Sequence, residues 1–125
     1  MLTYLVDDRG RNGEYAYFLE AHAERLPALE LEVMAHWSAL APRLAQRAPD
    51  LVLLDMQFDE GEVAQLCGDL DALAGSARFA GDLRRAETQL RRFQGVFLAQ
   101  TLRRHDFTGP IVLFHLLYFY LDPRF

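Results

Sequence analysis

The stretch PDLVLLDMQFDE, residues 49–60, joins a short apolar run to a group of acidic residues. Leu51–Leu54 are continuous branched apolar residues, which is the pattern of a strand buried on both faces. Asp55 follows directly, so a carboxylate is expected at the carboxyl end of this strand. Asp55 either begins a loop and caps the segment after it, or is held at the strand end to take part in chemistry.

The N-terminal part of the chain predicts an alternation of strands and helices. Leu2–Val6 is another short apolar run rich in strand-forming residues, and Asp7 and Asp8 close it. Apolar residues at helical spacing predict a helix over 14–26. Residues 29–35 alternate between an apolar side and a side with two glutamates, which predicts a half-exposed edge strand.

The next helix is predicted over 38–48, with Ser38 as its N-cap and Pro42 near its first turn. The order strand, helix, strand, helix, strand implies parallel strands joined by right-handed crossovers. In such an open sheet, ligands bind outside the carboxyl ends of the strands. If the first and third strands are neighbours, the aspartates that end them converge at one point.

The second half of the chain is mostly helical in pattern. Helical spacing of apolar residues predicts one helix over 60–74 and a longer one over 82–104. Gly109 and Pro110 end the longer helix, and 111–117 is predicted to form a fourth buried strand.

Composition places the chain among single globular domains. It has 125 residues, of which 51% are apolar and 25% charged. The net charge of -5 argues against nucleic acid as a direct partner. No signal peptide is recognisable, and the apolar run 111–121 is too short to cross a bilayer of about 30 Å. Cys67 is the one cysteine in the sequence, so an internal disulfide is impossible. We therefore expect a cytoplasmic protein with no membrane partner.

Three carboxylates at one point predict a cation. Asp7, Asp8 and Asp55 cannot all ionise comfortably side by side unless a positive charge offsets them. Hard oxygen ligands of this kind suit Mg²⁺. An aspartate beside such an ion can attack phosphorus and form an acyl phosphate. A nucleotide- or flavin-binding domain is disfavoured, because the loop DDRGRNGE lacks the glycine spacing that cradles phosphates.

The chain resembles a known family at these residues. The acidic pair in YLVDDRG, the strand PDLVLLDMQ and the spacing of 47 residues between Asp8 and Asp55 resemble the receiver domain of bacterial two-component response regulators. The stretch QGVFLAQTLRRHDFTGPIVLF is similar to the third helix and fourth strand of that family. The resemblance implies a flavodoxin-like, three-layer α/β/α fold with a parallel sheet.

The resemblance also implies a function. Asp55 would be the phosphoacceptor, and Asp7, Asp8, Asp55 and the backbone carbonyl of Gln57 would bind Mg²⁺. The chain would then receive a phosphoryl group from a histidine kinase or phosphotransfer protein and control an attached output domain, rather than act as an enzyme.

The sequence departs from the family at the residues that contact the phosphoryl group. His115 stands where the family has a Thr or Ser at the end of its fourth strand, and it is equally compatible with a buried histidine whose partners are backbone groups. The family's lysine has no counterpart, since all thirteen basic residues are arginine and Arg124 alone lies downstream. Asp59 replaces the proline that follows the phosphoacceptor.

The architecture implied by the resemblance is also altered. Residues 59–93 match nothing in the family and are interpreted as a helical insertion within a domain of residues 1–125. The last strand and helix of the family have no counterpart, which would leave the apolar run 111–121 on an exposed edge. We therefore expect a longer protein, or a homodimer or domain-swapped assembly that covers this edge.

Arginine pairs and an apolar stripe mark the longer predicted helix. Pairs at 84–85 and 91–92 share a helical face, which favours either an acidic docking partner or a solvated surface. The stripe consists of residues spaced by three and four: Leu83, Ala86, Leu90, Phe93 and Phe97. The stripe predicts self-association, so the alternative function is a receiver-like module that dimerises or docks without phosphorylation.

Overall fold

Four parallel strands form the sheet of the computed structural model, which describes residues 1–26 and 28–115. The strands are β1 (Leu2–Val6), β2 (Glu30–Met34), β3 (Leu51–Asp55) and β4 (Ile111–Phe114). Their order in space is β2-β1-β3-β4, which matches the first four positions of a flavodoxin-like sheet. β1 and β3 are therefore neighbours, which is the condition for their terminal aspartates to converge.

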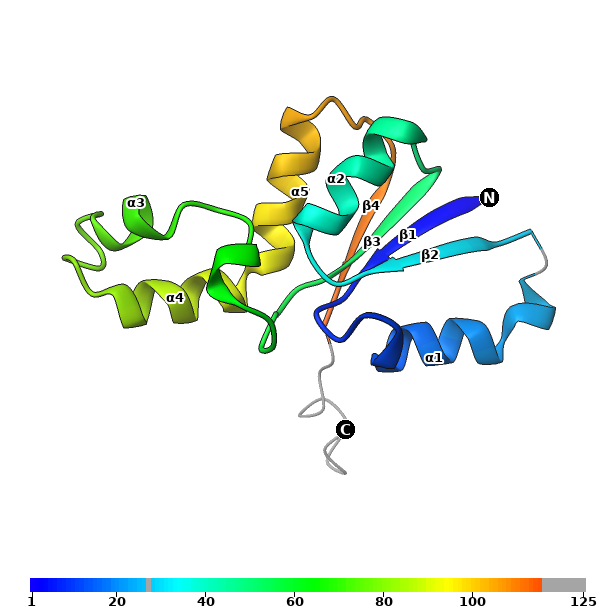
Figure 1. Cartoon of the computed structure of the whole chain (residues 1–125), viewed down its shortest axis with the longest axis horizontal. Coiled ribbons are helices and arrows are strands. Elements are labelled where there is room, and N and C mark those ends of the chain that lie inside the picture. The colour runs from blue at the N-terminus through cyan, green and yellow to red at the C-terminus, as the bar shows by residue number, and fades with distance from the viewer. Residues whose placement is uncertain (27, 116–125) are drawn as a thin grey trace, which may run out of the picture.

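Helices cover both faces of this sheet. They are α1 (Glu14–Ala21), α2 (Trp37–Gln46), α3 (Leu70–Ala74), α4 (Leu83–Arg92) and α5 (Gln94–Arg104). Figure 1 shows α1 on one face, α2 and α5 on the other, and α3 with α4 extending away from the sheet. The predicted α/β class with a flavodoxin-like parallel sheet is thus confirmed. None of the helices that the structure describes has the length and apolar character needed to cross a bilayer.

The face under α2 and α5 is closed by a continuous apolar core. Alternate residues of β1 and β3 point to this face because successive side chains of a strand alternate between its faces. Leu40 of α2 and Leu98 and Leu102 of α5 are fully buried against them. The strand residues of this core are Leu2, Tyr4, Val6, Val52 and Leu54.

The helix predicted over 14–26 is shorter than expected. α1 ends at Ala21, and a 3-10 turn spans Ala23–Arg25. The imidazole of His22 contacts the carbonyl oxygen of Phe18 at 2.8 Å at this end. The predicted apolar face of the helix is not buried, since Phe18 is 56% exposed. Only Ala16 of α1 is fully buried, so this helix covers its side of the sheet incompletely.

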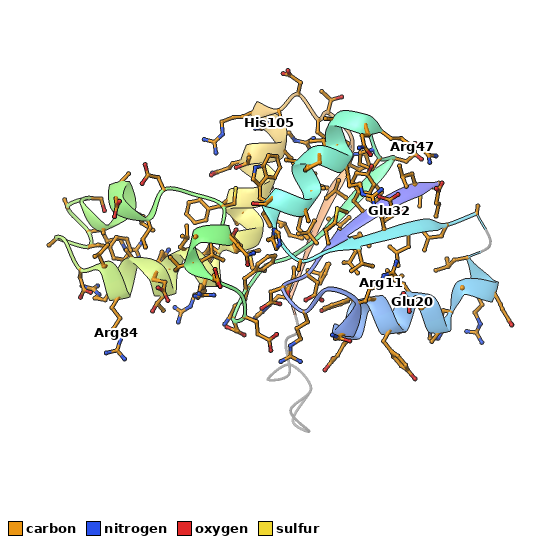
Figure 2. The ribbon with its side chains drawn as sticks, in the orientation of Figure 1. Arg11, Glu20, Glu32, Arg47, Arg84 and His105 are labelled. Atoms are coloured by element: carbon orange, nitrogen blue, oxygen red, sulfur yellow. The ribbon has the colours of Figure 1, made fainter. Side chains whose placement is uncertain are left out.

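The edge strand was predicted correctly, with slightly different ends. β2 lies at one edge of the sheet and pairs with β1 alone among the described strands. Its glutamates face arginines of the α2 segment: Glu32 lies 3.8 Å from Arg43, and Glu30 lies 3.1 Å from Arg47. Figure 2 shows Glu32 and Arg47 on this side of the sheet, and the pair Arg11 and Glu20 along α1.

The predicted start of the second helix was wrong. α2 begins at Trp37, its N-cap is His36 in an extended conformation, and Ser38 lies inside the first turn. Pro42 lies farther into the helix than the sequence suggested. Because Pro lacks an N–H, it leaves one carbonyl of the preceding turn without its helical partner.

The helix predicted over 60–74 was also wrong in extent. It divides into a 3-10 turn, Val63–Gln65, and the short helix α3. Gly68 lies between them with a φ of +108°, a conformation that L residues rarely adopt. A Cβ there would lie 2.6 Å from Leu90 Cδ1, so close packing also requires glycine at this position. Asp69 then caps α3 by accepting from the N–H of Ala72 at 3.0 Å.

The long helix predicted over 82–104 breaks at Phe93 into α4 and α5. α4 begins at Leu83, one residue after the predicted start, and Asp82 caps it by accepting from the N–H of Arg85 at 3.1 Å. α3 and α4 enclose a small core of their own, formed by Ala74, Phe79 and Ala86. α3 and α4 therefore form a separate projection beside the sheet (Figure 1). That residues 59–93 are an insertion stays a prediction.

The fourth strand ends earlier than predicted. β4 stops at Phe114, His115 follows it outside any strand, and residues 116 and 117 lie outside the described part of the chain. β4 pairs with β3 and forms an edge of the described sheet. Val112 is 47% exposed, so the predicted apolar edge is present in the described residues.

Candidate functional site

Three aspartates meet at the carboxyl end of the two central strands. Asp55 is the last residue of β3, while Asp7 and Asp8 directly follow β1. Val6 pairs with Leu54, so Asp7 continues the register beside Asp55. One carboxylate oxygen from each of the three aspartates lies within 4.8 Å of the others. The structure thus brings together the side chains that the sequence predicted to converge.

Asp7 is the most deeply placed of the three and is only 3% exposed. Its Oδ1 accepts a hydrogen bond from the N–H of Arg9 at 3.0 Å. Its backbone N–H donates to the carbonyl of Met34 at 3.0 Å, which ties it to β2. Gly13, which precedes α1, gives this carboxylate its space, because a Cβ there would lie 2.5 Å from Asp7 Oδ2.

Asp8 organises the loop that follows β3. Its Oδ2 accepts from the backbone N–H of Asp59 at 2.7 Å and from that of Glu60 at 2.8 Å. Arg91 of α4 supports the same loop by donating to the carbonyl of Gly61 at 3.0 Å. The loop is therefore held across the site from both sides. These contacts could not be predicted from the sequence, because backbone donors carry no residue signature.

Asp55 is partly buried and has few donors of its own. The backbone N–H of Gln57 approaches Asp55 Oδ1 at 3.4 Å. The Gln57 side chain turns instead to Asp59, to which it donates at 2.7 Å. The predicted metal contact through the Gln57 carbonyl stays a prediction, although the loop position of Gln57 beside Asp55 is compatible with it.

Burial and mutual repulsion raise the pKa of two of these acids. Burial raises the pKa of Asp55 to about 7, and the charges of Asp7 and Asp8 add to the effect. Burial likewise raises the pKa of Asp7 to about 6, against the opposing hydrogen bond from Arg9. Near neutral pH Asp55 is therefore partly protonated, and a bound cation would displace that proton.

The donor set fits a small hard cation. Oxygen ligands at 2.0–2.1 Å lie at most about 4.2 Å apart across an octahedral Mg²⁺. The oxygens of the cluster lie within 4.8 Å of one another, so they are close enough for one ion to draw them together. Asp7, Asp8 and Asp55 are the residues that could hold the ion, and the remaining ligand positions would be filled by water, as Mg²⁺ prefers.

The N-terminus of α5 abuts the same strand end. The backbone N–H of Gly95 donates to the carbonyl of Met56 at 3.0 Å. A Cβ on Gly95 would lie 2.7 Å from the carbonyl oxygen of Asp55, so glycine is needed for this approach. Sequence reasoning missed both Gly95 and Gly13. Gly13 directly precedes the helix predicted over 14–26, and Gly95 lies inside the helix predicted over 82–104, where a glycine could have marked a close contact.

His115 and the arginines occupy distinct surroundings. Phe114 pairs with Asp55, so His115 follows at the same end of the sheet and is half-buried there. Arg9 is the arginine that follows the acidic pair, and its side chain lies 3.6 Å from Glu60. Figure 2 shows Arg84, by contrast, pointing away from the protein on the far side of α4.

Part of the predicted apolar stripe is buried inside the protein. Ala86 and Leu90 are buried, while Leu83 and Phe93 are exposed. The stripe is therefore not a continuous surface, and its predicted role in self-association stays a prediction.

Comparisons of the chain with protein-family models, curated proteins and solved structures gave no match.

Proposed function

We propose that this chain is a signal-receiving domain of the response-regulator type, in which Asp55 accepts a phosphoryl group. The observation that carries the proposal is the meeting of three carboxylates at the ends of adjacent parallel strands, within 4.8 Å of one another. The donor would be a phosphohistidine of a histidine kinase or phosphotransfer protein. An attached output domain would be the target of the resulting change.

The chemistry follows from the arrangement of the acids. An oxygen of ionised Asp55 attacks phosphorus, a P–O bond forms, and the P–N bond to the donor imidazole breaks with departure of the imidazole. Mg²⁺ held by Asp7, Asp8 and Asp55 would offset the charge that builds up on the phosphoryl oxygens. A pKa of about 7 leaves much of Asp55 protonated at neutral pH, so cation binding also favours its nucleophilic form.

His115 is the candidate for contact with the phosphoryl group after transfer. It follows the strand residue that pairs with Asp55, and an imidazole can donate a hydrogen bond. Arg9 supplies a positive charge near Asp7, where it lowers the pKa of that carboxyl. Neither residue offers the compact ammonium group of a lysine.

The test is phosphorylation of the purified chain by acetyl phosphate with Mg²⁺, read by intact mass. We expect a gain of one phosphoryl group that Asp55→Asn abolishes and chelation of Mg²⁺ prevents. Asp71→Asn is the matched control, because Asp71 is an exposed carboxylate on α3, and it should leave the gain unchanged. A wild-type protein with no mass gain, or a gain that survives Asp55→Asn, would contradict the proposal.

A second candidate is a receiver-like module that docks or dimerises without phosphorylation. The specific support is that the carboxylate of Asp8 already accepts hydrogen bonds from two backbone N–H groups of the loop after β3. Asp59 also adds negative charge beside Asp55 and contributes to its raised pKa. This candidate predicts a dimer in light scattering that is unaffected by acetyl phosphate. A strict monomer at all concentrations would count against the homodimer.

A further inference from the structure

An apolar groove runs along the sheet beside α1. Its larger part is a cavity of about 710 Å³ lined by α1 residues, Leu53 and Phe114. A second part of about 460 Å³ continues past Leu19 and Leu53 toward Leu29 and Leu51. Because Leu19 and Leu53 line both parts, the two form one groove. Each part has the size of a ligand-binding cavity, which is about 300–1,000 Å³.

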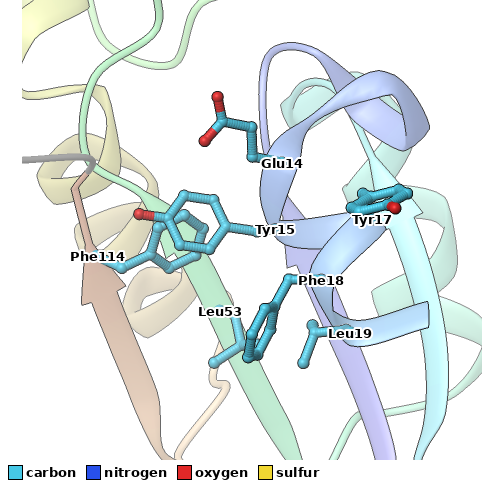
Figure 3. Close-up of a pocket in the computed structure, with 7 residues that line it drawn as sticks. All are labelled: Glu14, Tyr15, Tyr17, Phe18, Leu19, Leu53 and Phe114. Carbon is cyan, nitrogen blue, oxygen red and sulfur yellow. The ribbon is translucent and has the colours of Figure 1, made fainter. Parts of the chain in front are cut away.

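One end of the groove is aromatic and lies beside negative charge. The rings of Tyr15 and Phe114 lie 3.8 Å apart at an angle of 48°. Figure 3 shows these two rings against each other, with Phe18 beside the opening. Glu14 also lines this end, and Phe114 pairs with Asp55 of the acidic site. An anionic group would therefore be repelled at this end of the groove.

The other end of the groove is positively charged. Among the described residues, Arg25 carries the one charged side chain in the lining of the smaller cavity. Its guanidinium makes no ion pair or hydrogen bond within the described part of the chain. Arg43 and Arg47, by contrast, lie 3.8 and 3.1 Å from glutamates of β2. A guanidinium whose donors are free matches a carboxylate in geometry.

A buried hydroxyl in the same cavity also lacks a partner. Thr3 lines the smaller cavity and is 0% exposed, and its Oγ1 has no hydrogen-bond partner in the described part of the chain. Its side chain points to the α1 face, because its neighbours Leu2 and Tyr4 belong to the core of the other face. Buried polar groups are nearly always hydrogen-bonded, so an oxygen of a bound molecule would supply the missing partner.

We propose that this groove binds a straight-chain alkyl carboxylate. The carboxylate lies at Arg25 and Thr3, and the alkyl chain runs along Leu53 toward Phe114. The unequal charge of the two ends fixes this orientation, and the apolar lining between them selects an alkyl chain over a polar one. The site goes beyond the proposed phosphoryl transfer and does not depend on it.

Titration calorimetry of the full chain tests this proposal. It is done without Mg²⁺ and without a phosphoryl donor, so its outcome is independent of phosphoryl transfer. The probes are octanoate and decanoate, each below the concentration at which it forms micelles. We expect one site per chain and an affinity that rises up to about fourfold for each added CH₂. Decylammonium, which carries the opposite charge on the same alkyl chain, should bind more weakly than decanoate.

Two variants test the carboxylate end of the site. Arg25→Gln should weaken decanoate binding about fivefold without weakening decylammonium, because the charge acts on the carboxylate. Thr3→Val keeps the shape of the side chain but removes its hydroxyl, so it should also weaken decanoate binding about fivefold, with no loss of thermal stability. Arg84→Gln is the matched control and should change neither affinity, since Arg84 is an exposed arginine that points away from the protein on α4.

A further pair of variants tests the alkyl end. Phe18→Asp places a charge in the apolar wall and should weaken decanoate binding by about tenfold or more. Leu83→Asp is its control, because Leu83 is 53% exposed against 56% for Phe18 but lies on α4 away from the sheet. Circular dichroism of each variant verifies that the fold is unchanged.

Each other outcome overturns the proposal. No saturable binding of decanoate would show that the groove does not hold an alkyl carboxylate, and dimers in light scattering would then identify a second copy as the occupant. Equal weakening of decanoate and decylammonium by Arg25→Gln would show that the arginine does not act on the carboxylate. An unchanged decanoate affinity in Thr3→Val, or equal effects of Phe18→Asp and Leu83→Asp, would place the ligand outside the groove.

Discussion

The two faces of the sheet differ in how completely they are covered. Under α2 and α5, the side chains of β1 and β3 join one continuous core in which Leu40, Leu98 and Leu102 are fully buried. Under α1, only Ala16 of the helix is fully buried, and a groove remains open between α1 and the β3–β4 half. One helix is too narrow to cover four strands, whereas two helices are sufficient.

The acidic site lies where these unequal faces meet. Gly95 of α5 contacts the end of β3 from the closed side, and Phe114 of the open groove pairs with Asp55. The closed face fixes the position of the strand end, whereas the open face leaves room for a change of packing. That combination suits a switch, which needs a fixed site beside a segment whose packing can vary.

The largest expected effect is on the free energy of unfolding, and it should differ between a residue of the closed face and one of the open face. Leu98→Ala on the closed face should lower the free energy of unfolding by about 2–5 kcal/mol, because it leaves a cavity in a fully buried core. Val112→Ala on the open face should cost less than about 1 kcal/mol if its surface stays open to solvent. Urea denaturation measures both, and equal losses would show that the open face is as tightly packed as the closed one.

Gly95→Ala tests the contact between the closed face and the acidic site. The added methyl group would meet the backbone of Asp55 and Met56 at 2.7 and 2.9 Å, so we expect a loss of about 1–3 kcal/mol. Mg²⁺ affinity should fall with it, because the end of β3 must shift. Gln100→Ala, an exposed position on the same helix, should change stability by less than about 0.5 kcal/mol. Unchanged stability and Mg²⁺ affinity in the Gly95 variant would refute the contact.

Stability without Mg²⁺ should fall as the pH rises from 5 to 8. The pKa of Asp55 is about 7 in the folded chain, above its ordinary value of 3.8, so the folded state binds the extra proton over this range. The proton is lost as the pH passes 7, which we expect to cost about 1–2 kcal/mol after allowance for solvent screening. Thermal denaturation at several pH values measures this dependence of stability on pH, and Asp55→Asn should remove most of it. Asp71→Asn is the control and should show the same dependence as the wild type.

Mg²⁺ binding should show the opposite dependence on pH. Protons and the cation compete for Asp55, whose pKa of about 7 implies an affinity about tenfold weaker at pH 6 than at pH 8. Titration calorimetry at the two pH values measures this ratio. Most of the difference should disappear in Asp55→Asn, and a wild-type affinity independent of pH would mean that Asp55 is not a ligand.

Much of the central sheet could be predicted from the sequence. The apolar runs 2–6 and 51–54 and their terminal aspartates are local patterns, and the β-α-β order restricts the strands to a parallel arrangement. The helix boundaries were less predictable. The break at Phe93 and the turn at Gly68 depend on packing against distant residues, which apolar spacing does not encode.

The residues that could form the acidic site can be recognised in the sequence, because charge and strand ends are properties of neighbouring residues. How that site is held and what surrounds it depend on contacts that form when the chain folds. The backbone N–H groups that bind Asp8 come from a loop 51 and 52 residues away, and the apolar groove arises because α1 is the one helix on its face among the described residues. Contacts between segments so far apart depend on the path of the whole chain. Residues that the sequence pattern marked as a buried helix face, such as Phe18, thus became the wall of an open groove.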